Sequence, residues 1–83
     1  MINILYFASL REQLQSDSEQ LEMTSGITDI NSLIEVLRAR GGIWEEAFNG
    51  STVMLAVNQE VAKPTKILND GDEVAFFPPV TGG

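Results

Sequence analysis

The sequence has 83 residues, 43% of them hydrophobic and 20% charged, which is enough for one small globular domain. Five Lys and Arg residues stand against 12 Asp and Glu residues, and the resulting net charge of −7 argues against binding to nucleic acids or anionic membranes. The lack of Cys and His excludes disulfides and thiolate metal sites and removes the commonest general base near neutral pH. No apolar run approaches membrane-spanning length and no leader pattern stands at the N-terminus, so we expect a cytoplasmic location.

The residues Ile2–Phe7 predict a first strand, because β-branched and aromatic side chains dominate this stretch. Strand alternation places Ile4 and Tyr6 on the inner face of a sheet and Phe7 on the outer, polar face. A large aromatic side chain on a polar face indicates an interface, unless a loop or helix of the same chain covers it.

The next segment, Ser9–Leu14, predicts a short helix that Ser9 caps, with Glu12 three residues on in a capping-box pattern. Leu10 and Leu14 are one turn apart and are expected to face the core. After a polar connection, the alternation in Gln20–Met23 predicts a second strand that is antiparallel to the first.

The main helix is expected to begin at Thr28 as N-cap, with Asp29 in the first turn, where the helix dipole favours negative charge. Its core-facing stripe has the spacing i, i+3, i+4 and i+7 and consists of Ile30, Leu33, Ile34 and Leu37. Gly41-Gly42 is expected to end the helix. Trp44, Ala47 and Phe48 then predict a short helical turn at the edge of the core.

Three further strands are expected in the second half of the chain. Val53–Asn58 predicts a strand, and Val61 with Ala62 predicts a short edge strand that Pro64 limits. Glu73–Phe77 predicts the last strand, with Phe76 inward and Phe77 outward. The carboxylates of Asp70, Asp72 and Glu73 fit the chemistry of a tight turn better than a metal site.

The order of these elements predicts an α+β domain, a mixed sheet with one main helix packed across a single face. The first and last strands are expected to be central neighbours. In that arrangement Phe7 and Phe77 lie on the outer face, as an exposed aromatic patch beside the end of the last strand. We expect one domain over residues 1–77 and an extended tail over residues 78–83.

The tail itself has an unusual composition. Pro78 and Pro79 hold their φ angles near the extended value and cannot continue a sheet ladder. Gly82 and Gly83 lack a Cβ, so the chain end is thin enough to enter a narrow tunnel and deliver a carboxylate to its end. A terminal Gly-Gly is by itself weak evidence, because many chains end in small, disordered residues.

Three stretches of the sequence carry a family likeness, and the last spans fourteen residues: Phe7-Ala8-x-x-Arg11-Glu12, Ala56-Val57-Asn58-Gln59, and Asp70 through Gly83. Together they resemble the small subunit of molybdopterin synthase, the MoaD-type sulfur carrier with the ubiquitin-like β-grasp fold. The resemblance covers the whole chain, and its most specific part is the C-terminal stretch.

The resemblance implies that an adenylating enzyme similar to ubiquitin-activating enzymes converts the carboxylate of Gly83 to an acyl-adenylate. A persulfide sulfur then turns it into a thiocarboxylate. The carrier next inserts its tail into the large synthase subunit, in an expected heterotetramer, and donates sulfur to cyclic pyranopterin monophosphate. Two transfers build the dithiolene of molybdopterin for the molybdenum cofactor. No cofactor is expected to be bound permanently, only the transient acyl-AMP and thiocarboxylate.

The same resemblance implies roles for residues other than Gly83. Gly82 and Thr81 would let the tail thread into the partner. The residues expected to contact the partners are Phe7, Val61 and Phe77. No side chain of this chain is expected to act as acid or base, so the chain would be a sulfur-donating subunit rather than an independent catalyst.

Two alternatives remain open. Another β-grasp sulfur carrier, such as the one that serves thiazole synthesis for thiamin, also ends in Gly-Gly. Those chains are typically shorter and lack the helical insert from Ala8 to Glu12, which disfavours them here. A ubiquitin-like protein modifier would instead form amide bonds between Gly83 and lysines.

Overall fold

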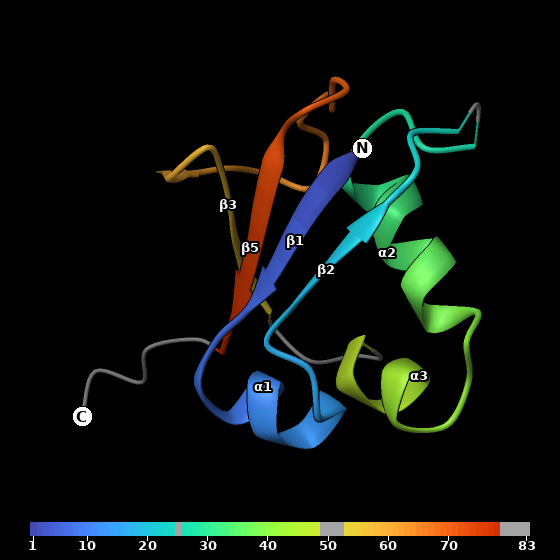
Figure 1. The fold of residues 1–83 in the computed structure, drawn as a ribbon, viewed down its shortest axis with the longest axis vertical. Helices are drawn as coiled ribbons and strands as arrows, with labels where there is room; N and C mark the ends of the chain where they lie inside the picture. Colours follow the sequence, from blue (N-terminus) through green and yellow to red (C-terminus); the bar gives the residue numbers. More distant parts are fainter. Residues whose placement is uncertain (25, 49–52, 79–83) are drawn as a thin grey trace.

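The computed structural model describes residues 1–24, 26–48 and 53–78. In chain order the elements are β1 (Ile2–Tyr6), α1 (Ala8–Leu14), β2 (Ser18–Leu21), α2 (Ile30–Arg38), α3 (Ile43–Phe48), β3 (Met54–Val57), β4 (Glu60–Val61) and β5 (Glu73–Phe77). In Figure 1, α2 lies beside the sheet, and α1 and α3 lie below the end where β1 and β5 finish. Within the described ranges, no helix is long and apolar enough to cross a membrane.

The described strands form one mixed sheet in the order β2-β1-β5-β3-β4. The central pair, β1 and β5, is parallel, with Tyr6 opposite Phe76, and the other pairs are antiparallel. The prediction that the first and last strands are central neighbours is therefore confirmed, as is the mixed α+β architecture.

One face of this sheet packs against the helices and forms the core. Its inward residues from β1, β3 and β5 are buried: Ile2, Ile4, Tyr6, Leu55, Val57, Val74 and Phe76. The stripe of α2 meets them through Ile30, Leu33 and Leu37, each of which is 0% exposed. Burying one side chain of this size contributes roughly 1.5–3 kcal/mol, so this single core dominates the stability of the domain.

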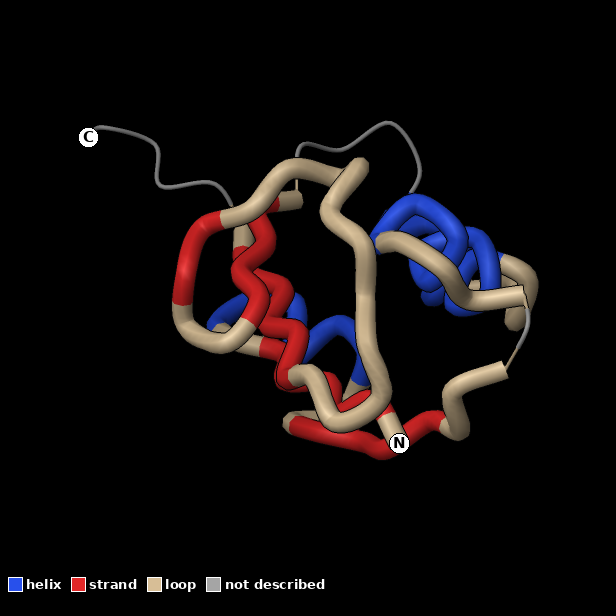
Figure 2. Tube along the Cα trace, turned by 90° about the horizontal axis from the view of Figure 1, so that it is seen from above, coloured by secondary structure: helices blue, strands red, loops and turns tan. Residues whose placement is uncertain are grey.

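In the view from above, the long connection between β4 and β5 passes between the sheet and α2 (Figure 2). Its hydrogen bonds tie it to the start of α2: the amides of Ile30 and Asn31 donate to the carbonyls of Lys66 and Pro64. The amide of Leu68 donates to the carbonyl of Thr28 at 3.0 Å. The segment from Pro64 to Leu68 is thereby fixed against the helix.

The predicted cap of the first helix is wrong. Phe7 occupies the N-cap position and makes no side-chain cap hydrogen bond, and the helix begins at Ala8. The chain turns directly out of β1, with Ala8 at a φ of 54°, so Ser9 already lies within the first turn. The predicted burial of Leu10 and Leu14 is confirmed.

The cap of the main helix is displaced by one residue. Asp29, not Thr28, is the N-cap, and its carboxylate accepts the Ser32 amide at 2.9 Å while the Ser32 hydroxyl accepts the Asp29 amide at 3.0 Å. Thr28 lies one position outside because its carbonyl bonds to the long connection. The predicted end is confirmed, since Gly41 and Gly42 adopt φ angles of 76° and 55°, which favour glycine.

Four strands differ from prediction at their ends: the first ends at Tyr6 rather than Phe7, and the third covers Met54–Val57 rather than Val53–Asn58. The second strand covers Ser18–Leu21 rather than Gln20–Met23, because it pairs with β1 in a register that turns Glu19 inward. Apolar alternation alone could not predict a carboxylate on the inner face. The edge strand covers Glu60 and Val61, one residue earlier than expected.

Candidate functional site

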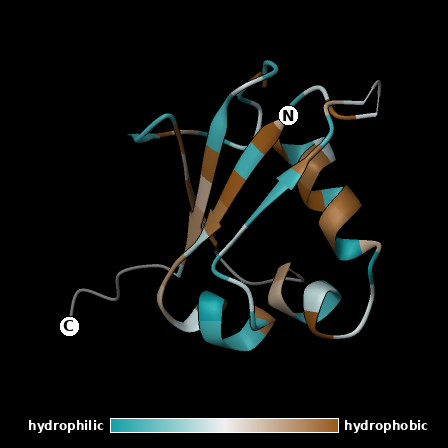
Figure 3. Ribbon diagram, in the orientation of Figure 1, coloured by the Kyte–Doolittle hydropathy of each residue, from teal (hydrophilic) through white to brown (hydrophobic). Residues whose placement is uncertain are grey.

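The face of the sheet opposite the core carries an apolar surface at the end where β5 finishes. We call this surface the docking face; it consists of the exposed Phe7 and Val61, the half-buried Leu5, Met54, Ala75 and Phe77, and Ala56, which is 8% exposed. Strand pairing places Val61, Ala56 and Ala75 in one row across β4, β3 and β5. Colouring by hydropathy shows β5 changing from hydrophilic at its start to hydrophobic along the rest of the strand (Figure 3).

The predicted aromatic pair lies on this face. Phe7 is 45% exposed and Phe77 is half-buried. They directly follow the paired residues Tyr6 and Phe76, and the Phe7 amide donates to the Phe76 carbonyl at 3.1 Å. The backbone thus holds the two outward aromatics next to each other, and their role in partner contact stays a prediction.

Val61, the third predicted contact residue, is 74% exposed on the short edge strand. The structure brings it into the same surface as the aromatic pair, through Ala56 and Ala75. Apolar side chains gathered on one face of a small protein mark an interaction site more often than scattered single residues do.

The opposite end of the same face is polar. The Gln20 side chain donates to the Asn3 side chain at 2.7 Å across β1 and β2. Asn58 accepts the Glu73 amide at 3.0 Å and donates to Asp72 at 3.1 Å. The face therefore has an apolar end beside the tail and a hydrogen-bonded polar end away from it.

The C-terminal tail starts at the apolar end. Pro78 follows β5 directly and is half-buried. Thr81, Gly82 and Gly83, the residues predicted to thread the tail and carry the chemistry, lie outside the described residues. The last described strand thus brings the chain to the edge of the docking face.

Beneath this end, on the inner side of the sheet, lies a cluster that sequence reasoning missed. The Tyr6 hydroxyl donates to Glu19 at 2.6 Å, and Arg40 donates to both oxygens of Glu19 at 2.9 Å. The Arg40 guanidinium lies 4.4 Å from the ring centre of Trp44. The rings of Trp44 and Tyr6 meet edge to face, with their centres 5.6 Å apart. No local signal marks the cluster in the sequence, because Glu19 lies in a run of polar residues before the predicted second strand.

The charges in this cluster support one another. Burial disfavours the ionised form of Glu19, but the hydrogen bonds from Arg40 and Tyr6 outweigh it and hold the carboxyl pKa below its ordinary value. Burial, with the hydrogen bond to Glu19, raises the pKa of Tyr6 far above its ordinary value. The hydrogen bonds to Glu19 raise the pKa of Arg40. The cluster is a fixed ion pair and not a proton-transfer site.

The acidic residues after the long connection form a turn, as predicted. The Asp72 carboxylate accepts the Asn69 amide at 2.8 Å, and the Asp72 amide donates back to the Asn69 carbonyl at 3.0 Å. Asp70 pairs with the N-terminal ammonium group of Met1. Turn formation and this ion pair account for both aspartates.

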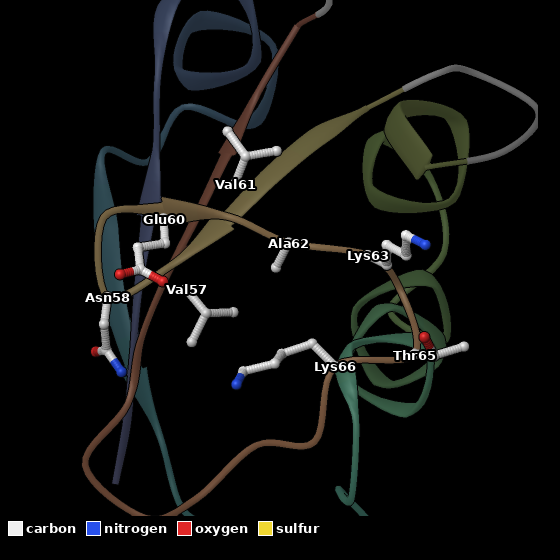
Figure 4. A pocket seen from close by; sticks show the side chains of 8 residues that line it. All are labelled: Val57, Asn58, Glu60, Val61, Ala62, Lys63, Thr65 and Lys66. Atoms are coloured by element: carbon white, nitrogen blue, oxygen red, sulfur yellow. The ribbon is translucent and has the colours of Figure 1, made fainter.

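A pocket of about 490 Å³ lies between the β3–β4 hairpin and the long connection (Figure 4). Its lining residues are Val57, Asn58, Glu60, Val61, Ala62, Lys63, Thr65 and Lys66. Lys66 reaches across the opening toward Val57, and Val61 points to the other side of the strand (Figure 4). None of these lining residues pairs a nucleophile with a general base, so the pocket does not resemble a hydrolytic or acyl-transfer site.

Comparison with known proteins assigns the chain to a family. Residues 4–83 match the model of the ThiS family. The molybdopterin synthase sulfur carrier subunit of Escherichia coli (strain K12) is 39% identical over 83 residues, covering 100% of both chains.

Solved structures agree with the fold. SAMP1 from Haloferax volcanii superposes with a TM-score of 0.81 at 25% identity, covering 99% of this chain and 98% of the other. A complex of subunits 1 and 2 of the molybdopterin-converting factor from Helicobacter pylori contains a chain with a TM-score of 0.67 at 20% identity, covering 99% and 97%. The fold is the ubiquitin-like β-grasp, and the chain belongs to the ThiS family, among relatives of the molybdopterin synthase sulfur carrier subunits.

Proposed function

We propose that this chain is the sulfur carrier subunit of a molybdopterin synthase and that it carries sulfur as a thiocarboxylate on Gly83. The observation that carries the proposal is the full-length match to a sulfur carrier subunit at 39% identity. The structure supports it because β5, the last described strand, ends beside an apolar face. The name of that relative favours molybdopterin over the thiazole of thiamin as the destination of the sulfur.

The chemistry belongs to the chain end rather than to a side chain. A carboxylate is a poor electrophile, so a Gly83 oxygen first attacks the α-phosphorus of ATP and pyrophosphate leaves. A persulfide sulfur then attacks the acyl carbon, AMP leaves, and a second thiol cleaves the S–S bond to release the thiocarboxylate. The proposed place of this reaction is the cytoplasm.

Transfer follows in the large subunit. The thiocarboxylate sulfur attacks an oxygen-bearing carbon of the cyclic pyranopterin, and the oxygen substituent on that carbon leaves as the C–O bond breaks. Water then hydrolyses the resulting thioester, which leaves the sulfur on the pterin and returns Gly83 to its original carboxylate. Gly82 and Thr81 are proposed to thread through the tunnel that leads there, where a bulky side chain at Gly82 would block entry.

The docking face is the proposed contact surface for both partners, the large subunit and the adenylating enzyme. Phe7 and Phe77 offer aromatic side chains of the kind that dominate binding energy at interfaces, and Val61 extends the surface across the sheet. The apolar end lies beside the tail, so docking there would aim the tail into the partner. The solved complex from Helicobacter pylori gives a relative of this fold that assembles with a second subunit.

Intact-mass spectrometry tests the proposal. The purified chain is incubated with its adenylating enzyme, ATP and a persulfide donor, and Gly83 is expected to gain the mass difference between sulfur and oxygen. A variant that lacks Gly83 is the control, and it should stay folded but unmodified.

The same experiment in a cell extract distinguishes the proposed function from its two alternatives, the protein modifier and the sulfur carrier for thiazole. Conjugates in which Gly83 is amide-linked to lysines, without a thiocarboxylate, would overturn the carrier function and establish a protein modifier. A thiocarboxylate that is passed on to thiazole rather than to a pyranopterin would keep the carrier chemistry and change only the acceptor.

A further inference from the structure

We propose that Glu19 and Arg40 are positioning residues for docking: through Tyr6 they fix the strand ends on which Phe7 and Phe77 stand. The inference rests on the proposed function, because it concerns how the docking face is presented to the large subunit.

The first step is the alternation of the central strands. Tyr6 and Phe76 face each other across β1 and β5, and their rings stack at 6.2 Å on the inner side. The next residue on each strand, Phe7 or Phe77, turns to the docking face. A displacement of the backbone at Tyr6 or Phe76 therefore also moves the outer aromatic residue that follows it, one peptide unit away.

The second step is what holds the inner rings. Phe76 is 0% exposed, and its ring meets the Phe48 ring edge to face with the ring centres 5.2 Å apart. Apolar contacts alone therefore fix the Phe76 ring. Tyr6 is different, because its hydroxyl needs an acceptor in a buried position. Glu19 supplies this acceptor at 2.6 Å.

The third step is what holds Glu19. Its strand, β2, is an edge strand, and the side chain is 22% exposed. Arg40 binds both carboxylate oxygens, a geometry that restricts a carboxylate more than a single contact does. Arg40 lies in the connection between α2 and α3 and covers the Trp44 ring, so the cluster joins both strands to the helical layer.

The far end of the same strand pair offers a matched comparison. There Gln20 and Asn3 also bond across β1 and β2, at 2.7 Å, but on the outer side and away from the aromatic pair. Both contacts tie β1 to β2, and only the Tyr6–Glu19 contact lies next to the aromatic pair Phe7 and Phe77. If these contacts only stabilised the pairing of β1 with β2, the loss of either one would affect docking equally.

The test uses the full-length chain as Tyr6→Phe, which removes one oxygen and keeps the ring, and as Arg40→Gln. Sulfur transfer is followed with the large subunit and the thiocarboxylated carrier as the varied substrate. We expect KM to rise about 3- to 10-fold, a range that corresponds to roughly 1 kcal/mol of docking energy, while kcat stays unchanged. Gln20→Ala is expected to leave both constants unchanged.

A second readout excludes a purely structural role. Hydrogen exchange at the Phe7 and Phe77 amides should accelerate in the Tyr6→Phe and Arg40→Gln proteins and stay unaltered in Gln20→Ala. Two folded variants with unchanged KM and unchanged exchange would overturn the positioning role. Should Arg40→Gln fail to fold, Tyr6→Phe alone decides.

The proposed function has its own control. Phe77→Asp alters the docking face directly and should raise KM whether or not the cluster positions it. If Phe77→Asp raises KM and the cluster variants do not, the positioning inference fails and docking through this face stands. If Phe77→Asp has no effect on KM, the docking assignment fails, and the positioning inference fails with it.

Discussion

Phe76 and Phe77 are identical residues, adjacent in one strand, and they lie in opposite environments. Phe76 is 0% exposed between Tyr6 and Phe48, whereas Phe77 is half-buried on the open face of the sheet. The first holds the domain together, and the second is available to another protein. The comparison shows that strand alternation, rather than residue type, decides which of the two rings is buried in the core.

The largest effect is expected from the inner member of the pair. Phe76→Ala removes a fully buried aromatic ring and should lower the free energy of unfolding by about 3–5 kcal/mol. Denaturant titration measures this loss. A loss below about 1 kcal/mol would show that the core closes over the gap and that the two faces differ less than their exposures indicate.

The outer member should give the reverse pattern. Phe77→Asp is expected to change stability by less than about 1 kcal/mol, because surface substitutions seldom do more. Its affinity for the large subunit should fall at least tenfold, because an aromatic anchor is replaced by a charge that must be desolvated. Calorimetric titration and an unfolding curve on the same sample separate the two effects. A large stability loss with normal affinity would assign Phe77 to the core.

The sequence could predict this separation because successive side chains of a strand point to opposite faces, and Asn3 and Glu73 mark the outer face of the first and last strands. The strand Glu73–Phe77 was predicted with its observed boundaries, and its pairing with β1 followed from the order of the elements. These regions rely on local patterns that burial reinforces.

Two features that the sequence did not predict, the inward orientation of Glu19 and the cap of the first helix, have the same physical cause. Glu19 faces inward, against its polarity, because Arg40 neutralises it from 21 positions further along the chain. No local pattern reports such a distant partner. Likewise Ser9 is a residue type that often caps helices, but the chain turns directly from β1 into the helix, so Phe7 occupies the N-cap position. Tertiary geometry decided both, and local preference did not.

Acidification should expose the dependence of the inner face on its ion pair. The pKa of Glu19 is lowered in the folded protein below its ordinary value of 4.5. Its stabilising contribution is therefore fully present above pH 4.5 and is lost as the pH falls through the folded-state pKa. Unfolding curves between pH 7 and 3 should show a smaller acid-induced loss for Glu19→Gln than for the unmodified chain.

The groups that face Glu19 are the Arg40 guanidinium and the Tyr6 phenol, and both keep their protonation over this range. Glu22→Gln provides the control, because this exposed carboxylate lies just beyond the same strand. An equal change in acid sensitivity for both variants would contradict the assignment to Glu19.

The smallest effect on stability is expected at Val61, which is 74% exposed on the edge strand. Val61→Lys removes little buried surface and should change the free energy of unfolding by no more than about 0.5 kcal/mol. It still places a charge on the docking face, so affinity for the large subunit should fall, though less than for Phe77→Asp, because Val61 lies at the rim of this face rather than beside the tail. If affinity is highest for the unmodified chain, lower for Val61→Lys and lowest for Phe77→Asp, the contribution to binding energy increases across the docking face toward the tail. The opposite order would move the centre of docking to β4, and the tail would then have to reach its target from the margin of the interface.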